Sequence, residues 1–253
     1  MPPFLDSDTA VRSTFTISPI DAPPYSCLTP CGSLGMATTT RSGNVKGHHY
    51  RLAVAETAVL YRSDAPDAAE IDDHLVNHPL AVCLRNTPGI IESRLLFSAQ
   101  SDTLPHSFVR NTLIADHKIS VPPLMFYDPA DGLPATVHLA HIGAALCGHA
   151  GIIHGGLLAT LFDEEMARAC FPTLPNKVGL TKKLEIDYRK PCPANSYIAC
   201  RAKTTKVEGR KAWVEAEIEL ISGDATEGTT LATAKALFVE PRNTKHMVKA
   251  IDV

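Results

Sequence analysis

The stretch GHAGIIHGGLLATLFDEEMARACFP, residues 148–172, decides the fold. Its letters after Gly156 predict one apolar helix of about four turns, which Phe171-Pro172 ends. A strand is predicted before this helix at 135–143. Four more strands follow it, at 184–189, 197–207, 212–221 and 230–239. One long apolar helix followed by an antiparallel meander predicts an α+β fold in which a sheet wraps around a central helix.

Alternation in the third of these later segments indicates how the sheet is exposed. Charged or amphipathic letters alternate there with apolar ones, which predicts a strand with one face in solvent and one face buried. The outer set is Trp213, Glu215, Glu217 and Glu219, and the inner set is Val214, Ala216, Ile218 and Leu220.

The composition excludes several classes of function. Of 253 residues, 45% are hydrophobic and 20% are charged, which is enough to bury a core. A formal net charge of −3 gives no global basic field of the kind that recruits nucleic acid. No apolar run approaches the roughly 20 residues that span a bilayer, so the sequence reads as soluble, with no membrane span expected.

Four segments are expected along the chain. Residues 1–49 are rich in Ser, Thr and Pro and are predicted to be disordered. Residues 50–120 predict short helices, one of them over 64–75. Residues 121–241 form the main domain, and residues 242–253 form a C-terminal tail.

The basic stretch 36–51 bears on where the protein resides. It would suit an organelle-targeting leader if translation began at Met36, whereas Asp6 and Asp8 argue against a leader in the full chain. Cytoplasmic and mitochondrial locations are both left open.

Cysteine and histidine usage argues against a metal centre. The seven cysteines are odd in number, irregularly spaced and without a CxxC pair, so neither a disulfide framework nor a zinc site is expected. Most are interpreted as small buried hydrophobes in a reducing compartment. His138 and His141 fall in a predicted strand at a spacing that directs them to opposite faces. No metal and no cofactor are therefore expected.

The start of the central helix carries the chemistry. Gly155 and Gly156 leave their amide N–H groups unobstructed, and the helix dipole adds partial positive charge there. Such a terminus can polarise a thioester carbonyl and stabilise the oxyanion formed on attack. Asp163 lies seven residues after Gly156, so it returns to the same helix face about 10.5 Å further along the axis. Within one helix, the glycine N–H groups and the Asp163 carboxylate are therefore too far apart to act on one carbonyl. We therefore expect a homodimer, or a dimer of dimers, in which a second subunit completes the site.

Three segments resemble a known family. They are HGGLLATLFDE (154–164), VGLTKKLEIDYRKP (178–191) and VEGRKAWVEAEIE (207–219), and they are similar to the PaaI-like branch of hotdog-fold thioesterases. The combination of HGG, an Asp nine residues after that His, and YRxP after a strand-opening Thr is specific. The resemblance covers about 120–240, with a weaker echo at 68–92, where some fungal-type members also have an N-terminal extension. It implies a hotdog fold and hydrolysis of an acyl-CoA or carrier-bound acyl thioester.

The resemblance also implies roles for individual residues. Gly155 matches the residue whose N–H binds the thioester oxygen. Asp163 matches a carboxylate that acts as nucleophile or general base from the opposite subunit. Thr181 matches a Ser or Thr that orients the attacking water, and His154 matches a positioning residue. Many members have an Asn six residues before the HGG histidine, whereas this chain has Gly148 there.

Further residues are candidates for substrate binding. Gly156 shares the helix start, and His149 could enter the site in place of the absent Asn. Arg189, Arg210 and Lys211 lie at predicted strand ends, where they could meet the phosphates of coenzyme A. Solvated strand ends explain these basic residues nearly as well.

The acidic residues after Asp163 are expected at the surface. Glu164 and Glu165 lie four and three residues before Arg168, the spacing of ordinary surface ion pairs on a helix.

Two other functions stay open from sequence alone. The chain could be a non-catalytic module that binds acyl-CoA or an acyl carrier. It could also be a hotdog enzyme recruited to release or transform a product in a biosynthetic pathway. Hydratase-type members pair an Asp with a His close by in sequence. Here no His follows Asp163 until His246, which argues against that chemistry.

Overall fold

The computed structural model describes residues 67–94, 107–129, 132–221, 223, 226 and 228–244. The predictions of disorder at 1–49 and of a leader at 36–51 lie outside these residues. The segment boundaries drawn at 50, 121 and 242 stay predictions.

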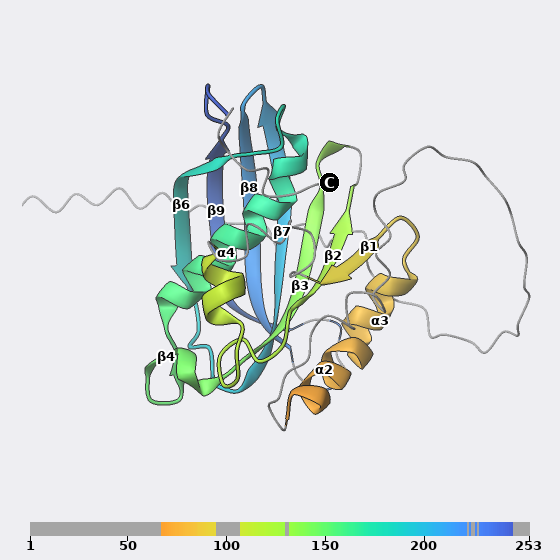
Figure 1. Cartoon of the computed structure of the whole chain (residues 1–253), viewed down its shortest axis with the longest axis vertical. Coiled ribbons are helices and arrows are strands. Elements are labelled where there is room, and N and C mark those ends of the chain that lie inside the picture. The colour runs from red at the N-terminus through yellow and green to blue at the C-terminus, as the bar shows by residue number, and fades with distance from the viewer. Residues whose placement is uncertain are drawn as a thin grey trace, which may run out of the picture. The chain divides into compact units, whose positions relative to one another are not determined.

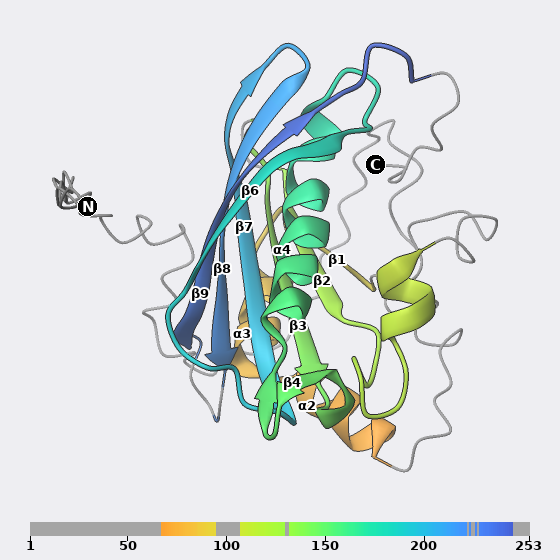
Figure 2. The ribbon, with the colours of Figure 1, turned by 90° about the vertical axis from the view of Figure 1, so that its left-hand side faces the viewer.

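A seven-stranded antiparallel sheet curves around one long helix (Figures 1 and 2). The strand order is β1-β2-β3-β7-β8-β9-β6, and helix α4 (Gly155–Cys170) lies along the inner face. The predicted α+β hotdog architecture is therefore confirmed. The strands of the sheet are β1 (Ile91–Arg94), β2 (Leu124–Asp128), β3 (Ala135–Ile142), β6 (Leu180–Tyr188), β7 (Ser196–Glu208), β8 (Lys211–Ile221) and β9 (Thr229–Val239).

The main core lies between α4 and the sheet. Phe162 and Met166 are fully buried on the helix side, and Ile218 and Phe238 are fully buried on the strand side. Burying side chains of this size contributes about 1.5–3 kcal/mol each. A short 3₁₀ turn, Phe171–Thr173, follows α4 where the sequence predicts its end. This packing sets the rotation of α4 about its axis. The α4 side chains that do not face the main core therefore point toward strand β6 or strand β3.

The predicted alternation in β8 is confirmed at most positions. Val214, Ala216 and Ile218 are buried, while Leu220 is only half-buried because it lies near the end of the strand. On the outer face, the Glu215 carboxylate forms an ion pair of 2.7 Å with a lysine of the neighbouring strand β9.

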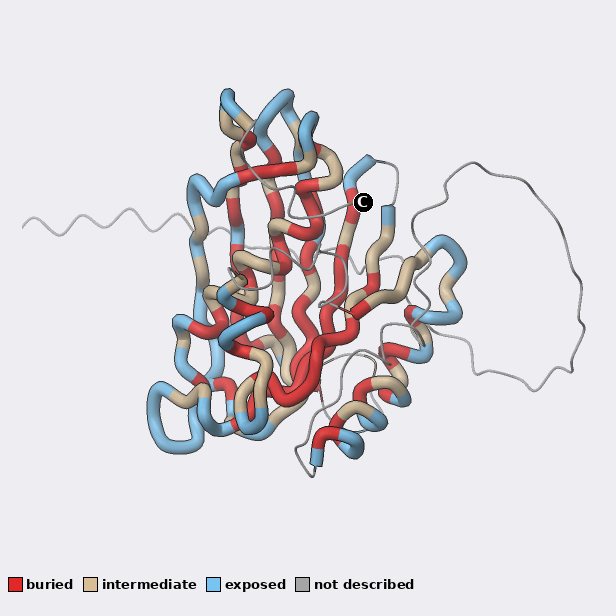
Figure 3. Tube along the Cα trace, in the orientation of Figure 1, coloured by how far each residue is buried: buried red, intermediate tan, exposed pale blue. Residues whose placement is uncertain are grey.

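A second group of buried residues lies at β2 and β3, where the tube in Figure 3 is largely red, and its side chains pack on the outer face of the sheet. Helices α2 (Ala68–Asn77) and α3 (Pro79–Asn86) pack there, and they account for two of the short helices expected before residue 120. Strand β3 is buried on both faces as a result. The buried residues of this group include Leu75, Leu80, Leu84, Phe126 and Leu139.

The region before residue 120 also differs from the expectation of short helices alone. Residues 91–94 form strand β1, and Phe108–Leu113 form one turn of π-helix. Strand β1 has only four residues and is held by its pairing with β2, so no local pattern announces it.

The cysteines mostly match the interpretation as buried thiols. Cys170, Cys192 and Cys200 are buried and free, and Cys147 is half-buried and free. Cys83 in α3 is disulfide-bonded, so the expectation of unpaired cysteines is wrong at that position. Among the described residues, no helix has the length and apolar character needed to cross a membrane. In the same residues, no group of three or more His, Cys, Asp or Glu side chains is arranged to hold a metal ion.

Candidate active site

The start of α4 presents one free backbone donor. A hairpin of β4 (Cys147–His149) and β5 (Ile152–Ile153) leads into the helix, and His154 is its N-cap residue. The His154 Nδ1 accepts the Gly156 N–H at 2.8 Å, so the proton of the neutral ring resides on Nε2. The Gly155 N–H has no hydrogen-bond acceptor among the described residues. Of the two glycine amides, Gly155 is therefore the one available to a substrate oxygen.

Asp163 and Thr181 meet within one chain. The Thr181 hydroxyl donates to the Asp163 Oδ1 at 2.6 Å, which joins the middle of α4 to the start of β6. Asp163 is half-buried and Thr181 is exposed, so water can reach the pair. Eight residues of helix separate Gly155 from Asp163, about 12 Å along the axis. Within one chain, the backbone donor and the carboxylate are too far apart to act on the same carbonyl.

Tyr188 contacts the helix start, and the sequence reasoning did not single it out. Its hydroxyl donates to the Gly155 carbonyl oxygen at 2.8 Å from the far end of β6. The sequence pointed to Tyr188 only through the motif YRKP (188–191), which carried the family resemblance but no role for the tyrosine.

The basic candidates lie at two ends of the sheet. Arg189 follows Tyr188 at the Gly155 end, and its guanidinium lies 3.3 Å from the Thr233 hydroxyl. Lys211 is exposed at the start of β8, and the adjacent Arg210 donates to the Glu240 carbonyl at 2.6 Å. Both Lys211 and Leu180 pair with Val239 of β9. Arg210 and Lys211 therefore share the end of the sheet that carries Thr181.

The hairpin before α4 leaves little room for a side chain at Gly148. A Cβ atom on Gly148 would lie 2.8 Å from the His154 Cδ2, so the imidazole occupies the space that a side chain would need. His149 is exposed at the hairpin, and its Nδ1 accepts the N–H of the following residue. No described contact brings His149 to Asp163 or Gly155.

The comparisons with known proteins identify the family of this chain. The family model described as "Thioesterase superfamily" matches residues 150–226. A UPF0644 protein of Schizosaccharomyces pombe is 31% identical over 188 residues, which are 74% of this chain and 71% of that protein. The chain belongs to the thioesterase superfamily. The resemblance to PaaI-like hotdog thioesterases is thereby confirmed at the level of the family.

Two further relatives of this chain have informative names. "Acyl-coenzyme A thioesterase THEM4" of Mus musculus is 34% identical over 116 residues, which are 46% of each chain. The chain thus spans about half the length of that relative. An "Uncharacterized protein, mitochondrial" of Candida albicans is 33% identical over 125 residues, which are 49% of this chain and 55% of that protein.

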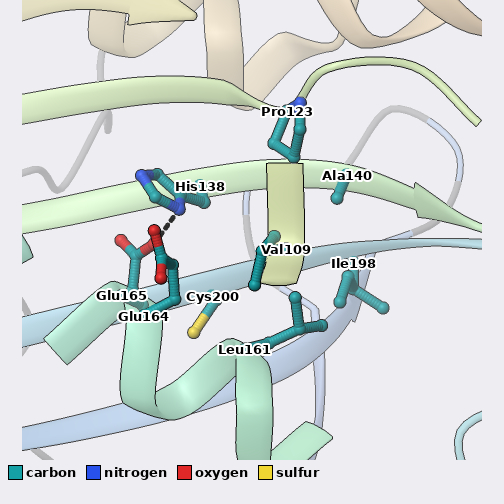
Figure 4. Close-up of a pocket in the computed structure, with 9 residues that line it drawn as sticks. All are labelled: Val109, Pro123, His138, Ala140, Leu161, Glu164, Glu165, Ile198 and Cys200. Atoms are coloured by element: carbon teal, nitrogen blue, oxygen red, sulfur yellow. Dashed lines mark ion pairs between the residues drawn. The ribbon is translucent and has the colours of Figure 1, made fainter. Parts of the chain in front are cut away.

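Glu165 is buried, so the expectation that it lies at the surface is wrong. It is 1% exposed and contacts the His138 Nδ1 across the interface between α4 and β3 (Figure 4). Local spacing suggested a pair with Arg168, but Arg168 lies 2.6 Å from Glu164 instead. The predicted partner of Glu164 is therefore confirmed, whereas its place at the surface is not, because Glu164 is half-buried and Arg168 is buried.

Burial sets the charge states around Glu165. Burial and the nearby Arg168 hold the pKa of His138 well below its usual range, so a neutral imidazole can donate its Nδ1–H to the carboxylate. Burial lowers the pKa of Arg110 to about 10, and the charge of Arg168 adds to this effect. His138 and Glu165 border a small pocket between α4 and β3 with apolar walls that include Val109 and other side chains shown in Figure 4. Because Asp163 turns toward β6, this pocket is separate from the Asp163–Thr181 pair.

Proposed function

We propose that the protein hydrolyses an acyl-CoA thioester at a site shared by two subunits of a homodimer. The observation that carries the proposal is the Asp163–Thr181 hydrogen bond, which lies about 12 Å along α4 from the free Gly155 N–H. Membership of the thioesterase superfamily and the name of the mouse relative support thioester hydrolysis as the class of reaction.

The chemistry follows from the two halves of the site. The Gly155 N–H binds the thioester oxygen and stabilises the negative charge that develops there. Thr181 holds one oxygen of Asp163, which leaves the other free to take a proton from water as the water oxygen attacks the carbonyl carbon. The carbon–sulfur bond then breaks, and the proton passes from Asp163 to the leaving thiolate. Direct attack by the carboxylate, with water releasing the acyl group afterwards, is the other route open to the same residues.

The exposed edge of the sheet supports a shared site. Among the described residues, strand β6 pairs with β9 alone, so its other edge is open to a further strand, and Leu180 and Tyr188 on it are 56% and 53% exposed. A two-fold axis at this edge would bring Gly155 of one subunit toward Asp163 of the other. The same axis would bring Arg189 of one subunit and Arg210 of the other to one site, where they could bind the phosphates of coenzyme A.

We further propose a mitochondrial location. The mitochondrial label of the Candida albicans relative supports it, and acyl-CoA is a substrate available to a mitochondrial enzyme. Fluorescence microscopy of the full chain tagged at its C-terminus tests the proposal, and exclusion of the signal from mitochondria would contradict it.

Hydrolysis by the wild type and by Asp163→Asn tests the proposed reaction. Short, long and aromatic acyl-CoAs are supplied as a panel, and release of the coenzyme A thiol is followed. Asp163→Asn keeps the acceptor for Thr181 but cannot take a proton, so we expect kcat to fall by about 10² to 10⁴-fold with the melting temperature nearly unchanged. Glu164→Gln is the matched control, because Glu164 is next along α4 and pairs with Arg168 instead.

The outcomes separate the proposal from its main alternative. Full activity in Asp163→Asn, or a larger loss in Glu164→Gln, would overturn the role of Asp163. A wild type that retains intact acyl-CoA through purification, detected by mass spectrometry, but hydrolyses none of the panel would identify a binding module.

A further inference from the structure

We propose that Tyr188 is a positioning residue that holds the oxyanion donor of Gly155 in place, an inference that rests on the proposed function. Its hydroxyl donates to the Gly155 carbonyl oxygen at 2.8 Å. Its ring lies beside the same residue, since a Cβ atom added to Gly155 would be 3.4 Å from the Tyr188 Cε1 and Cζ. The hydroxyl therefore holds the carbonyl, and the ring lies within contact distance on the Cα side of Gly155.

The first turn of α4 needs such support. The N–H groups of a helix's first turn have no partners within the helix, so this turn is the part of a helix most free to shift. His154 holds the Gly156 N–H from one side, and Tyr188 holds the Gly155 carbonyl from another. These two contacts hold the Gly155–Gly156 peptide, and the Leu157 N–H, which donates to the His154 carbonyl at 2.9 Å, holds the preceding peptide that carries the Gly155 N–H. With the peptides on both sides of Gly155 held, its N–H points in one direction before a substrate arrives. Donors oriented in advance are the ones that stabilise a developing oxyanion without reorganisation.

Stability alone does not account for this hydrogen bond. Within a single subunit Tyr188 is 53% exposed, so water can replace the Gly155 carbonyl as partner of its hydroxyl, and the net contribution to the folding of that subunit is small. The hydrogen bond matters for the position of Gly155, because a water molecule cannot fix the Gly155 carbonyl relative to strand β6. Strand β6 carries Tyr188 at one end and Thr181, the partner of Asp163, about 23 Å away at the other. One strand thus supports both the donor and the carboxylate of its chain.

The substitution Tyr188→Phe tests the proposal, because it keeps the ring and removes only the hydroxyl. We expect kcat for acyl-CoA hydrolysis to fall about three- to tenfold while KM is unchanged, since an oxyanion donor acts in the transition state. We expect the melting temperature to change by less than about 3 °C. Tyr188 acts through the Gly155 N–H, so on a Gly155→Pro background, which lacks this N–H, Tyr188→Phe should lower kcat by less than about twofold.

A spectroscopic readout separates positioning from other effects. The infrared stretch of a ¹³C-labelled thioester carbonyl is recorded with acyl-CoA bound to the non-hydrolysing Asp163→Asn protein. A well-placed donor lowers the stretching frequency, so adding Tyr188→Phe should shift the band back toward its position in solution. A carbonyl band that Tyr188→Phe leaves unchanged would contradict a positioning role for the hydroxyl.

The results distinguish this inference from the proposed function. If the wild type hydrolyses acyl-CoA and Tyr188→Phe is equally active, the inference is wrong and the proposed function stands. An undiminished effect of Tyr188→Phe on the Gly155→Pro background also overturns it, as does a loss of kcat that accompanies a large fall in melting temperature. A wild type that hydrolyses no thioester overturns the proposed function itself and the inference with it.

Discussion

Replacing Gly155 with proline removes one hydrogen-bond donor and changes little else. Gly155 is the first residue of α4, the helical position at which proline is best tolerated. The residue before a proline must be extended, and His154 already is, with φ −64° and ψ 129°. The Gly155 N–H has no acceptor among the described residues, so no hydrogen bond of the fold is lost. Apart from placing the proline Cδ where the amide hydrogen was, the substitution removes only the N–H that we assign to the oxyanion.

The expected loss is large. Removing one oxyanion donor lowers kcat by about 10² to 10³-fold, or about 2.7–4 kcal/mol of transition-state stabilisation. Release of the coenzyme A thiol measures it. Gly155→Ala is the matched control, because it adds a Cβ at the same 3.4 Å from the Tyr188 ring but keeps the N–H. We expect Gly155→Ala to retain kcat within about threefold.

Mixing two inactive variants then tests whether the site is shared. In a mixed dimer of Gly155→Pro and Asp163→Asn subunits, one site has both residues intact and the other has neither. Random exchange at equal concentrations makes half of the dimers mixed, so activity should recover to about a quarter of the wild-type value. Each variant alone should stay near or below about 1%.

Two results would refute this reasoning. If the mixture stays as inactive as its components, although differently tagged subunits co-purify, then the donor and the carboxylate do not come from different chains. If Gly155→Ala is as inactive as Gly155→Pro, the space at this position matters and its N–H does not.

Three further predictions concern binding and stability. Arg210→Glu should raise KM for acyl-CoA more than it lowers kcat, because a phosphate contact binds ground and transition states alike; an unchanged KM at low salt would remove Arg210 from the site. Glu165→Ala should lower the free energy of unfolding in urea by about 3 kcal/mol by breaking a buried pair, whereas Glu208→Ala, at the exposed pair with Lys206, should leave it almost unchanged. Burial lowers the pKa of His141, so the unfolded chain protonates first below about pH 6.5. His141 alone should then lower the free energy of unfolding by up to about 1.4 kcal/mol per pH unit, in addition to the contribution of His138, and His141→Gln should remove only the His141 share of this slope in urea titrations.

Much of the fold could be predicted because its signals are local. The central helix is a single apolar run with a proline at its end, and alternation in β8 shows directly which of its side chains are buried. Asp163 and Thr181 were assigned to one reaction by resemblance, and the structure joins them by a hydrogen bond across 18 residues. Their shared role stays a prediction until the kinetics are measured.

The failures arise where a partner distant in sequence decides the outcome. Glu165 has the local spacing of a surface ion pair, but the rotation of α4 turns it toward His138, which is 27 residues away on another strand. Tyr188 reads as an ordinary strand residue until β6 is placed beside the start of α4, 33 residues earlier. Short strand β1 exists only through its pairing with β2. No periodicity within one segment contains these contacts.

Because α2 and α3 pack over β3, a fragment that lacks these two helices should not stay in solution. The family match begins at residue 150, yet the sheet residues Leu124, Phe126 and Leu139 are fully or almost fully buried. A protease that cut after Arg94 and released the preceding residues would uncover a contiguous apolar strip on the back of the sheet. Such strips drive self-association. A shortened chain would therefore precipitate even though every residue of the proposed site was still present.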